Sequence, residues 1–288
     1  NAMNDALRRR PNCSVEVLRA RAELLAEIRQ FFAERNVLEV QTPCLGSHTV
    51  TDPNIETIAI PDQGYLQTSP EFYLKRLLAA GAPSLYQMGP VFRAGERGAL
   101  HNPEFTMLEW YRLGFDDAAL MAEVAELVDM ALGAGEYRTL TYEQVCTNAP
   151  ARHADAELTF VAGLEALGQV RVFVVDFPPG QAALARLRGT PPTAARFELV
   201  VDSVEVANGY HELGDPAELR ERFSADLAIR RERGASLPAV DEAFLAAMDA
   251  GLPDSAGVAV GIDRLLMLRL GADSLSEVLP FAHTDAVD

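Results

Sequence analysis

The sequence predicts an α+β fold in which an antiparallel sheet is flanked by helices. Two strand–loop–strand patterns, over residues 91–113 and 196–213, contain the β-branched and aromatic residues typical of paired strands. A third run, over residues 256–268, is apolar and contains glycine, and it indicates a strand that continues into a helix. Stretches with helical periodicity stand before and between these strands, so we expect helices to cover the sheet.

The length and composition indicate a globular protein with a full hydrophobic core. With 288 residues, of which 49% are hydrophobic, the chain suits one large domain as well as two small ones. Lys and Arg number 25 against 42 Asp and Glu, and the net charge of −17 argues against extensive nucleic-acid binding. No apolar run is long enough to span a membrane and no signal-peptide pattern is seen, so we expect no membrane association.

Cysteine usage favours a reducing, cytoplasmic location. Cys13, Cys44 and Cys146 are far apart and form no CxxC pair, so neither a disulfide framework nor a zinc site is predicted.

The first regular element is an amphipathic helix over residues 15–35, for which Ser14 is a suitable N-cap. Its apolar residues recur at three- and four-residue steps: Val15, Leu18, Ala22, Leu25, Ile28 and Phe32. Asn36 can end the helix, and residues 37–40 read as a strand that stops at Pro43.

A second strand leads directly into a second helix. Residues 65–68 read as the strand, Ser69 as the N-cap of the helix and Pro70 as a residue of its first turn. On local grounds alone, Glu71 only complements the positive end of the helix dipole.

Residues 91–113 predict an antiparallel hairpin with a long mobile loop. Period-two alternation sends Glu109 and Tyr111 to one face of its second strand, together with Phe105 and Met107. Arg93, at the start of the loop, can clamp a phosphate bidentately, and the glycine-bearing loop can close over it. Taken one residue at a time, the pattern favours the simpler alternative, a half-buried hairpin whose charges meet water.

The middle of the chain predicts further helices and one strand. Asp116 or Asp117 caps a helix that continues to about Leu132, residues 142–167 read as short helices, and residues 170–176 read as a buried strand.

The second hairpin places two carboxylates together. A two-residue turn at Asp202 and Ser203 makes Val201 face Val204, Val200 face Glu205 and Glu198 face Ala207. Glu198 and Glu205 then lie on one face as diagonal neighbours, roughly 7 Å apart. A magnesium ion bridged to phosphate oxygens would satisfy both; the alternative is that both face solvent.

The last third of the chain predicts two scaffold helices and a final strand–helix unit. Asp215 and Pro216 start a helix to about Arg233, with Phe223, Leu227 and Ile229 as its core stripe, and a second helix spans residues 240–250. In the unit at 256–268, Gly261 allows close approach of a ligand to the backbone. Arg264 adds charge at a helix N-terminus, which suits anions.

Five segments together resemble the lysyl type of the class II aminoacyl-tRNA synthetases. The helix and strand ending at Pro43 resemble motif 1, Phe92-Arg93 followed by residues 101–111 (HNPEFTMLEWY) resembles motif 2, and residues 256–268 resemble motif 3. The Ser69-Pro70-Glu71 segment and the segment with Glu205, Asn208, Gly209, Tyr210 and Glu212 complete the match. The resemblance covers about residues 14–282 and implies the class II catalytic domain.

This resemblance implies roles for particular residues. Arg93 and Arg264 would be the catalytic residues, and Glu198 and Glu205 would bind magnesium. The substrate-binding set would be Ser69, Pro70, Glu71, Glu109, Tyr111, Asn208, Glu212 and Ala259. The ATP-binding set would be Arg93, Gly95, Glu96, His101, Asn102, Glu205, Val206, Gly261 and Arg264. Motif 1 implies a homodimer.

The implied chemistry is the activation of a diamino acid. Attack of its carboxylate on the α-phosphorus of ATP gives an aminoacyl adenylate and pyrophosphate, a step that needs positioning and charge stabilisation but no protein nucleophile. Glu71 would hold one ammonium, and Glu212 with Tyr111 the distal one. A buried carboxylate left without a cation is penalised, so neutral side chains would be rejected.

Within this group, the chain resembles the truncated paralogues that ligate (R)-β-lysine to a lysine side chain of elongation factor P. We assign residues 1–13 to a tag remnant and N-terminal tail, since Asn1 and Ala2 precede Met3, and residues 14–288 to the catalytic domain. There is no room for an anticodon-binding OB-fold before the first helix. Ala259, where lysyl-tRNA synthetases usually have glycine, also matches these ligases.

One departure leaves other functions open. The usual Arg-x-Glu of motif 2 is Arg93-Ala94-Gly95 here, which puts the adenine contact of that Glu in doubt and makes Glu96 a candidate substitute. The alternatives are an enzyme with a tRNA or small-amine acceptor, and a catalytically silent regulatory paralogue. Retention of Arg93, Glu198, Glu205 and Arg264 argues against the silent paralogue.

Overall fold

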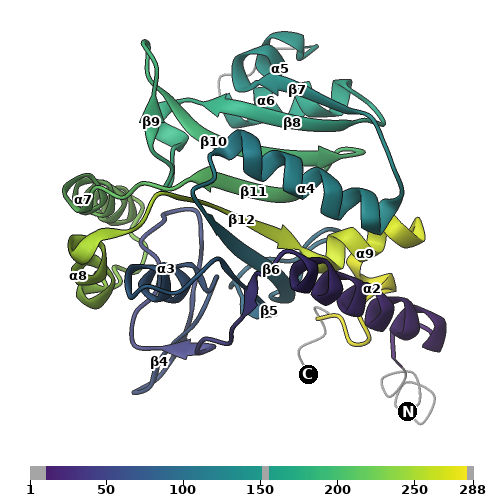
Figure 1. Ribbon diagram of the computed structural model, residues 1–288, viewed down its shortest axis with the longest axis horizontal. Helices are drawn as coiled ribbons and strands as arrows, with labels where there is room; N and C mark the ends of the chain where they lie inside the picture. Colours follow the sequence, from purple (N-terminus) through teal and green to yellow (C-terminus); the bar gives the residue numbers. More distant parts are fainter. Residues whose placement is uncertain (1–10, 151–155, 284–288) are drawn as a thin grey trace.

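A nine-stranded sheet forms the centre of the computed structural model, which describes residues 11–150 and 156–283 (Figure 1). Its strands lie in the order β1-β5-β6-β12-β11-β10-β8-β7, with β9 paired to β10. Neighbouring strands are antiparallel apart from two parallel pairs, β1 with β5 and β7 with β8. The predicted α+β fold, an antiparallel sheet flanked by helices, is confirmed.

The strands of this sheet are β1 (Leu38–Glu39), β5 (Leu85–Phe92), β6 (Glu104–Leu113), β7 (Tyr137–Thr141), β8 (Arg171–Phe177), β9 (Leu187–Arg188), β10 (Thr193–Val201), β11 (Val204–His211) and β12 (Ser255–Gly261). A smaller sheet contains β2 (Leu45–Gly46), β4 (Gly64–Leu66) and β3 (Ile58–Ile60). The helices are α2 (Val15–Glu34), α3 (Glu71–Ala79), α4 (Asp117–Leu132), α5 (Tyr142–Asn148), α6 (Ala156–Ala166), α7 (Pro216–Glu232), α8 (Glu242–Gly251) and α9 (Ile262–Leu270), with short 3₁₀ turns at Pro179–Gln181 and Leu275–Glu277.

The two faces of the sheet have different coverings. Helices α2, α4 and α9 share the largest hydrophobic core with β6, β10, β11 and β12, and α4 crosses the sheet in Figure 1. Leu108 and Trp110 of β6 and Val258 and Val260 of β12 point into this core. Residues that alternate with them must face the other side of the sheet. That side packs on α5 and α6 near β8, and it carries polar side chains on β6 and β11.

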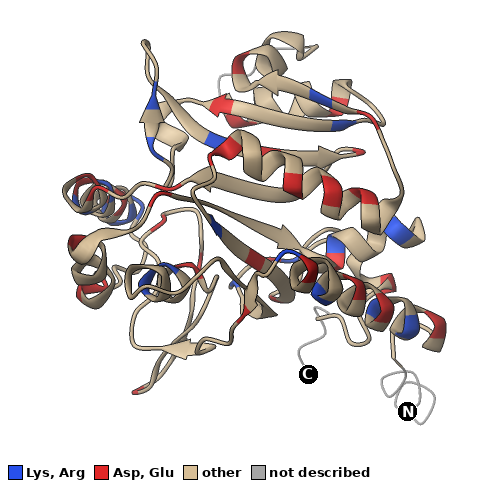
Figure 2. Ribbon diagram, in the orientation of Figure 1, with Lys and Arg blue, Asp and Glu red and all other residues tan. Residues whose placement is uncertain are grey.

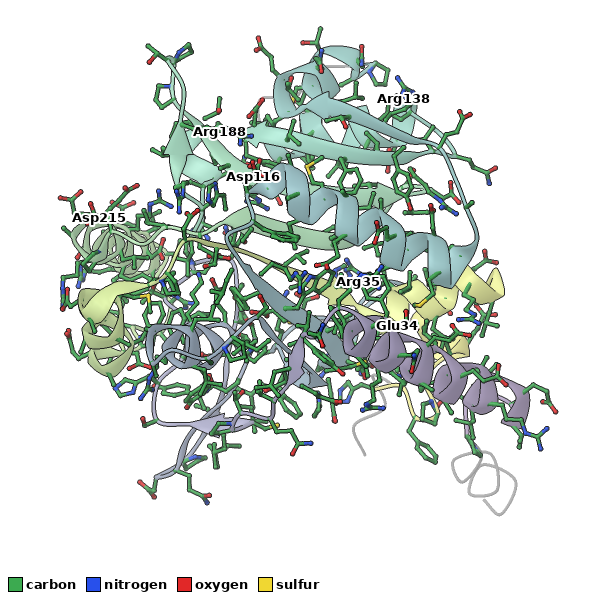
Figure 3. The ribbon with its side chains drawn as sticks, viewed as in Figure 1. Glu34, Arg35, Asp116, Arg138, Arg188 and Asp215 are labelled. Atoms are coloured by element: carbon green, nitrogen blue, oxygen red, sulfur yellow. The ribbon has the colours of Figure 1, made fainter. Side chains whose placement is uncertain are left out.

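The predicted starts of helices α2, α4 and α7 are confirmed. Ser14 caps α2, Asp116 caps α4 and Asp215 caps α7, each by accepting a hydrogen bond from a backbone N–H of the first turn. Asp116 and Asp215 are labelled in Figure 3. Figure 2 shows that α4 carries acidic residues and no Lys or Arg, as expected for a chain of net charge −17.

Three local predictions on helices were wrong. Helix α3 begins at Glu71, so Pro70 rather than Ser69 occupies the cap position, although the Ser69 hydroxyl still accepts from the Glu71 N–H at 3.0 Å. In α7, Ile229 is exposed and Arg230 is buried in its place. On α2, the predicted apolar stripe includes Val15, which is 58% exposed, and Leu18, which is 38% exposed.

The second hairpin has the predicted turn but not the predicted register throughout. Asp202 and Ser203 both have positive φ, and Val200 pairs with Glu205 as predicted. Beyond this pair the register shifts, so that Glu198 faces Asn208 instead of Ala207. Val206 is the extra residue of a β-bulge on β11. The bulge keeps Glu205 and Asn208 on the same face although they are three residues apart.

Two further findings complete the description. Strand β7, parallel to β8, was not predicted from the sequence. Among the described residues, no helix is both long and apolar enough to cross a membrane. The predicted tag remnant, with most of the tail at 1–13, lies outside the part of the chain that the structure describes.

Candidate active site

Four of the predicted site residues form one row across the sheet. Glu109 on β6 pairs with Ala259 on β12, Ala259 pairs with Asn208 on β11, and Asn208 pairs with Glu198 on β10. Paired residues of antiparallel strands point to the same face, here the one opposite the main helical core. Segments up to 150 residues apart in sequence thus contribute to one line of side chains.

A second row lies beside the first. Tyr111 pairs with Gly257, Gly257 with Tyr210, and Tyr210 with Arg196. A Cβ atom on Gly257 would come within 2.5 Å of Cδ1 of Tyr111 and 2.6 Å of Oε1 of Glu212, so these side chains lie directly over the glycine. Glycine at this position is required because the tyrosine ring and the carboxylate occupy the space of any side chain.

Glu109 holds its neighbours in place and is buried at 3% exposure. Its Oε2 accepts from the Ser69 hydroxyl at 2.7 Å, and its Oε1 accepts from the Tyr111 hydroxyl at 2.7 Å. Burial and the nearby charge of Glu71 raise the pKa of Glu109 to about 7. Both of its oxygens are engaged, so Glu109 fixes Ser69 and Tyr111.

A buried lysine joins the two other carboxylates of this region. The Lys75 Nζ lies 2.5 Å from Oε1 of Glu71, one helical turn earlier on α3, and 2.6 Å from Oε2 of Glu212. The side chains of Lys75 and Glu212 are each 1% exposed. Burial lowers the pKa of Lys75, but the carboxylates of Glu212 and Glu71 together outweigh burial and raise it above its ordinary value. The ammonium is therefore charged.

The same burial acts on Glu212. Burial raises the pKa of Glu212 to about 8, the Lys75 ammonium opposes this rise, and Glu71 adds to it. Burial and the carboxylate of Glu109 also raise the pKa of Tyr111 well above its ordinary value. This part of the site thus contains more carboxylates than its own cation can neutralise.

Four buried polar atoms on this side of the sheet have no hydrogen-bond partner among the described residues: Oε1 and Oε2 of Glu212, Oδ1 of Asn208 and Nε of Arg196. Oε2 of Glu212 forms the ion pair with Lys75, which leaves the other three atoms as orphans. Buried polar groups are almost always paired, so such orphans indicate a missing ligand or water. The two orphan oxygens are acceptors, and a cationic donor such as an ammonium is the group that suits them.

The two predicted arginines lie at opposite sides of the motif 2 loop. The Arg93 side chain stands over the ring of Phe105, with 5.3 Å from its guanidinium carbon to the ring centroid, and its Nε donates to Thr68 O at 3.4 Å. Arg264, in the first turn of α9, donates to Glu205 O at 2.8 Å and to Leu100 O at 3.2 Å. Arg264 therefore ties the loop to the start of β11.

The loop itself contains the residues predicted for ATP. His101 Nε2 lies 3.0 Å from an Arg264 nitrogen and 3.3 Å from Oε2 of Glu96. The Asn102 side chain accepts from the His283 N–H at 2.8 Å and donates to Glu104 O. Asn102 thus links the loop to the C-terminal segment.

Gly95 occupies the position of the usual motif 2 Glu, and an acidic side chain from another segment lies beside it. Gly95 has φ +75°, and a Cβ there would lie 3.3 Å from Oε2 of Glu56. The backbone N–H of Ala94 donates to Glu56 O at 3.0 Å, which keeps the two segments side by side. Glu96, the candidate substitute for the usual Glu, lies 3.3 Å from His101 Nε2, and its role as substitute stays a prediction; Glu56 is a second carboxylate beside position 95.

The residues of the predicted magnesium site lie on one face but have unequal environments. Glu198 is buried and pairs with Arg196, whereas the Glu205 side chain is 46% exposed. Burial, and then the charge of Glu205, raise the pKa of Glu198 to about 7. A divalent cation would relieve this repulsion, so the pair fits Mg²⁺. No group of three potential ligands is found among the described residues, so the remaining ligands would have to be phosphate oxygens or water.

Strand β12 runs beneath the site, and its glycines Gly257 and Gly261 lie at different ends of it. Gly257 lies under Tyr111 and Glu212, whereas a Cβ on Gly261 would meet only Arg264 side-chain atoms at 3.7 Å or more. Gly261 is also the residue before α9, where free backbone N–H groups favour an anion. The bulged Val206 points into the main core instead, and its side chain is 2% exposed. At position 206, only the backbone can contact a ligand on the site face.

Sequence reasoning missed Lys75, Gly257, Arg196 and Glu56. Lys75 carried a signal, since Glu and Lys four residues apart on a helix lie on one face. Gly257 lies two residues before Ala259 and four before Gly261, so the period of two could have placed it on the same face. Nothing in the sequence pattern connects Glu56 with position 95.

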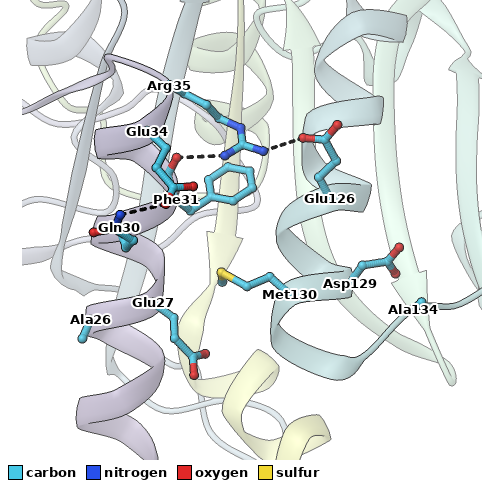
Figure 4. A pocket seen from close by; sticks show the side chains of 10 residues that line it. All are labelled: Ala26, Glu27, Gln30, Phe31, Glu34, Arg35, Glu126, Asp129, Met130 and Ala134. Atoms are coloured by element: carbon cyan, nitrogen blue, oxygen red, sulfur yellow. Dashed lines mark hydrogen bonds and ion pairs between the residues drawn. The ribbon is translucent and has the colours of Figure 1, made fainter.

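A groove lies elsewhere, between α2 and α4 (Figure 4). It has a volume of about 830 Å³, an apolar floor that includes Phe31 and Met130, and acidic residues at its rim. Arg35 crosses it to pair with Glu126 at 2.7 Å. Three of its acidic residues, Glu27, Glu126 and Asp129, are paired to arginines, and the fourth, Glu34, accepts a hydrogen bond from the Gln30 side chain at 2.7 Å.

Comparison with known proteins agrees with this geometry. The family model of the class II tRNA synthetases (D, K and N) matches residues 4–285. The chain belongs to the class II tRNA synthetase family.

The most similar relatives define a narrower group within that class. The chain is 44% identical to the elongation factor P–(R)-β-lysine ligase of Vibrio cholerae serotype O1, over 94% of this chain and 96% of the relative. It is 43% identical to the ligase of the same name from Vibrio vulnificus, over 94% of this chain and 97% of that relative. It is 40% identical to the ligase of the same name from Edwardsiella ictaluri, over 97% of this chain and 99% of that relative.

Proposed function

We propose that this protein is an ATP-dependent ligase that activates (R)-β-lysine, or lysine, as an aminoacyl adenylate and transfers it to a lysine side chain of elongation factor P. The observation that carries the proposal is the pair of carboxylates on Lys75, the partly buried Glu71 and the buried Glu212, with the unpaired Oε1 of Glu212 beside Gly257. The names of the relatives supply the identity of the amino acid and of the acceptor.

In the first step, a carboxylate oxygen of the amino acid attacks the α-phosphorus of ATP, and the bond to the β,γ-diphosphate breaks. The products are the aminoacyl adenylate and pyrophosphate. Arg93 and Arg264 would stabilise the phosphate charge, and Gly261 would let the nucleotide approach the backbone. Bound at Glu198 and Glu205, Mg²⁺ would supply charge neutralisation for the phosphates.

The amino-acid end would be recognised by charge. One substrate ammonium would bind Glu71 and the distal one Glu212, while Tyr111 and Asn208 would complete the pocket. Ala259 would set its floor, and Ser69 and Pro70 would position the start of α3. A neutral side chain would leave a buried carboxylate unpaired, which costs about 1–3 kcal/mol or more.

In the second step, the amine nitrogen of the acceptor lysine attacks the acyl carbon, the bond to the phosphate oxygen breaks, and AMP leaves. The acceptor amine loses one proton as the amide forms. This step needs no covalent intermediate on the protein, which agrees with the absence of any cysteine or serine in the two rows of the site.

The test is ATP–pyrophosphate exchange with α-lysine, (R)-β-lysine and a neutral amino acid, without any acceptor. We expect exchange with the diamino compounds alone, strongest with the β-isomer. Transfer of labelled amino acid to purified elongation factor P, with tRNA as the competing acceptor, identifies the second substrate. No exchange with any compound would refute the proposal and favour a binding or regulatory role.

We further propose that the protein acts in the cytoplasm as a homodimer of one catalytic domain per chain. Support for the dimer comes from the apolar residues Val15, Leu18 and Leu38, which are 58%, 38% and 48% exposed near the motif 1 helix. The mass of single particles at low concentration tests this, and a monomer would refute it.

A further inference from the structure

Lys75 is the only lysine among the 288 residues, although the chain has 25 basic residues in total. It is also one of the most buried side chains, at 1% exposure. Every other basic residue is an arginine. A position that alone keeps lysine, in the interior, requires a compact ammonium rather than a planar guanidinium.

Lys75 contacts one carboxylate oxygen of each of its two partners. Glu71 gives Oε1 to Lys75, and Glu212 gives Oε2. Oε1 of Glu212 is then left without a partner in the described part of the chain and lies over Gly257. Glu109 has no oxygen to spare, because Ser69 and Tyr111 bind both of them.

We propose that Lys75 is a positioning and specificity-determining residue, which holds one oxygen of Glu71 and one of Glu212 so that the other oxygen of each meets one substrate ammonium. This inference rests on the proposed function. When Glu71, Glu109 and Glu212 are all ionised, their charges and that of the Lys75 ammonium leave two negative charges, which match the two ammonium groups of a diamino acid.

Loss of this ammonium would change both geometry and charge. Without it, the carboxyl groups of Glu71, Glu109 and Glu212 would lie together with no cation of the protein between them, and they would hold protons up to a higher pH than in the wild-type protein. A protonated carboxyl is a poor partner for an ammonium, so the substrate would have to displace a proton. The Michaelis constant for the diamino acid would rise and would fall again at high pH.

The first experiment follows Lys75 directly by NMR. Protein labelled with ¹⁵N at lysine Nζ gives one ammonium signal, because the chain has one lysine. We expect the signal to remain that of a charged ammonium above pH 10 and to shift on addition of lysine or (R)-β-lysine, but not of a neutral amino acid. Titration near the ordinary lysine pKa, or no response to diamino acids that support exchange, would overturn the proposal.

The second experiment compares variants by ATP–pyrophosphate exchange over a range of pH. For Lys75→Met we expect a Michaelis constant for the diamino acid raised about 100-fold near pH 7, with less change at high pH and little change in that for ATP. Lys75→Arg should not restore the wild-type Michaelis constant for the diamino acid, because the guanidinium is too large for the space between the carboxylates. The control is Arg76→Met, which removes a cation from the same helix without touching Glu71 or Glu212.

The outcomes separate the two proposals. Wild-type protein without exchange refutes the proposed function. Wild-type exchange with unchanged constants and pH profile in Lys75→Met refutes the role of Lys75 alone. If Lys75→Met does not fold, the NMR measurement on the wild-type protein still decides.

Discussion

Substitution of Gly257 by alanine should damage both stability and substrate binding. The added methyl would lie 2.5 Å from Cδ1 of Tyr111 and 2.6 Å from Oε1 of Glu212. Both side chains are held by hydrogen bonds or ion pairs, so neither can move freely. Overpacking of this kind costs about 1–3 kcal/mol. For domains near this size that corresponds to about 2–4 °C in melting temperature per kcal/mol.

The assay combines thermal unfolding with ATP–pyrophosphate exchange. Gly257→Ala should melt several degrees lower and raise the Michaelis constant for the diamino acid more than that for ATP. Gly89→Ala on β5 is the matched control, since a Cβ there has no neighbour within 4 Å. Gly261→Ala should have the wild-type melting temperature but a changed Michaelis constant for ATP. A Gly257→Ala protein with wild-type stability and wild-type constants would refute the reasoning.

Three further predictions concern charge and buried polar contacts. The raised pKa values of Glu109, about 7, and Glu212, about 8, mean that the ligand-free folded protein holds protons which the unfolded chain releases near pH 4.5. Their contribution to the free energy of unfolding is therefore complete below pH 4.5 and is lost as the pH rises through 7–8. Binding of a diamino acid at pH 7 should release these protons, and calorimetry in buffers of different ionisation enthalpy measures that release. Glu198→Gln should raise the Mg²⁺ concentration for half-maximal exchange by about 10-fold or more, and an unchanged Mg²⁺ dependence would remove Glu198 from the metal site. Arg230→Met should cost more than about 3 kcal/mol in unfolding free energy, because Arg230 donates to the carbonyls of Thr51, Asp52 and Ile55. The matched control, Arg220→Met, removes an exposed ion pair and should leave the midpoint of the same denaturant titration almost unchanged.

The fold was predictable where local physics decides the structure. Caps such as Ser14 and Asp116 fixed the helix starts because their side chains satisfy backbone N–H groups nearby in sequence. The turn at Asp202 and Ser203 was equally local. Strand β7 was not predictable, because its polar sequence gains its hydrogen bonds from β8, some thirty residues away.

The arrangement of the site was predictable only in part. The period of two placed Glu109 and Tyr111 together, and the structure joins them by a hydrogen bond. The two-residue turn gave Glu198 the right face but the wrong partner, Ala207 instead of Asn208, because a bulge at Val206 adds a residue that no local pattern marks. Buried charge pairs such as Lys75 with Glu212 depend on strands and helices far apart in sequence, so their partners appear only in three dimensions.

The interior position of the single lysine also bears on what an activated amino acid can react with. Aminoacyl adenylates acylate accessible amines, and the only ε-amine of this chain is enclosed between Glu71 and Glu212. The enzyme therefore offers its own reactive intermediate no side-chain target. In a transfer assay, mass added to the protein fraction reports on the acceptor alone, with only the terminal amine as background.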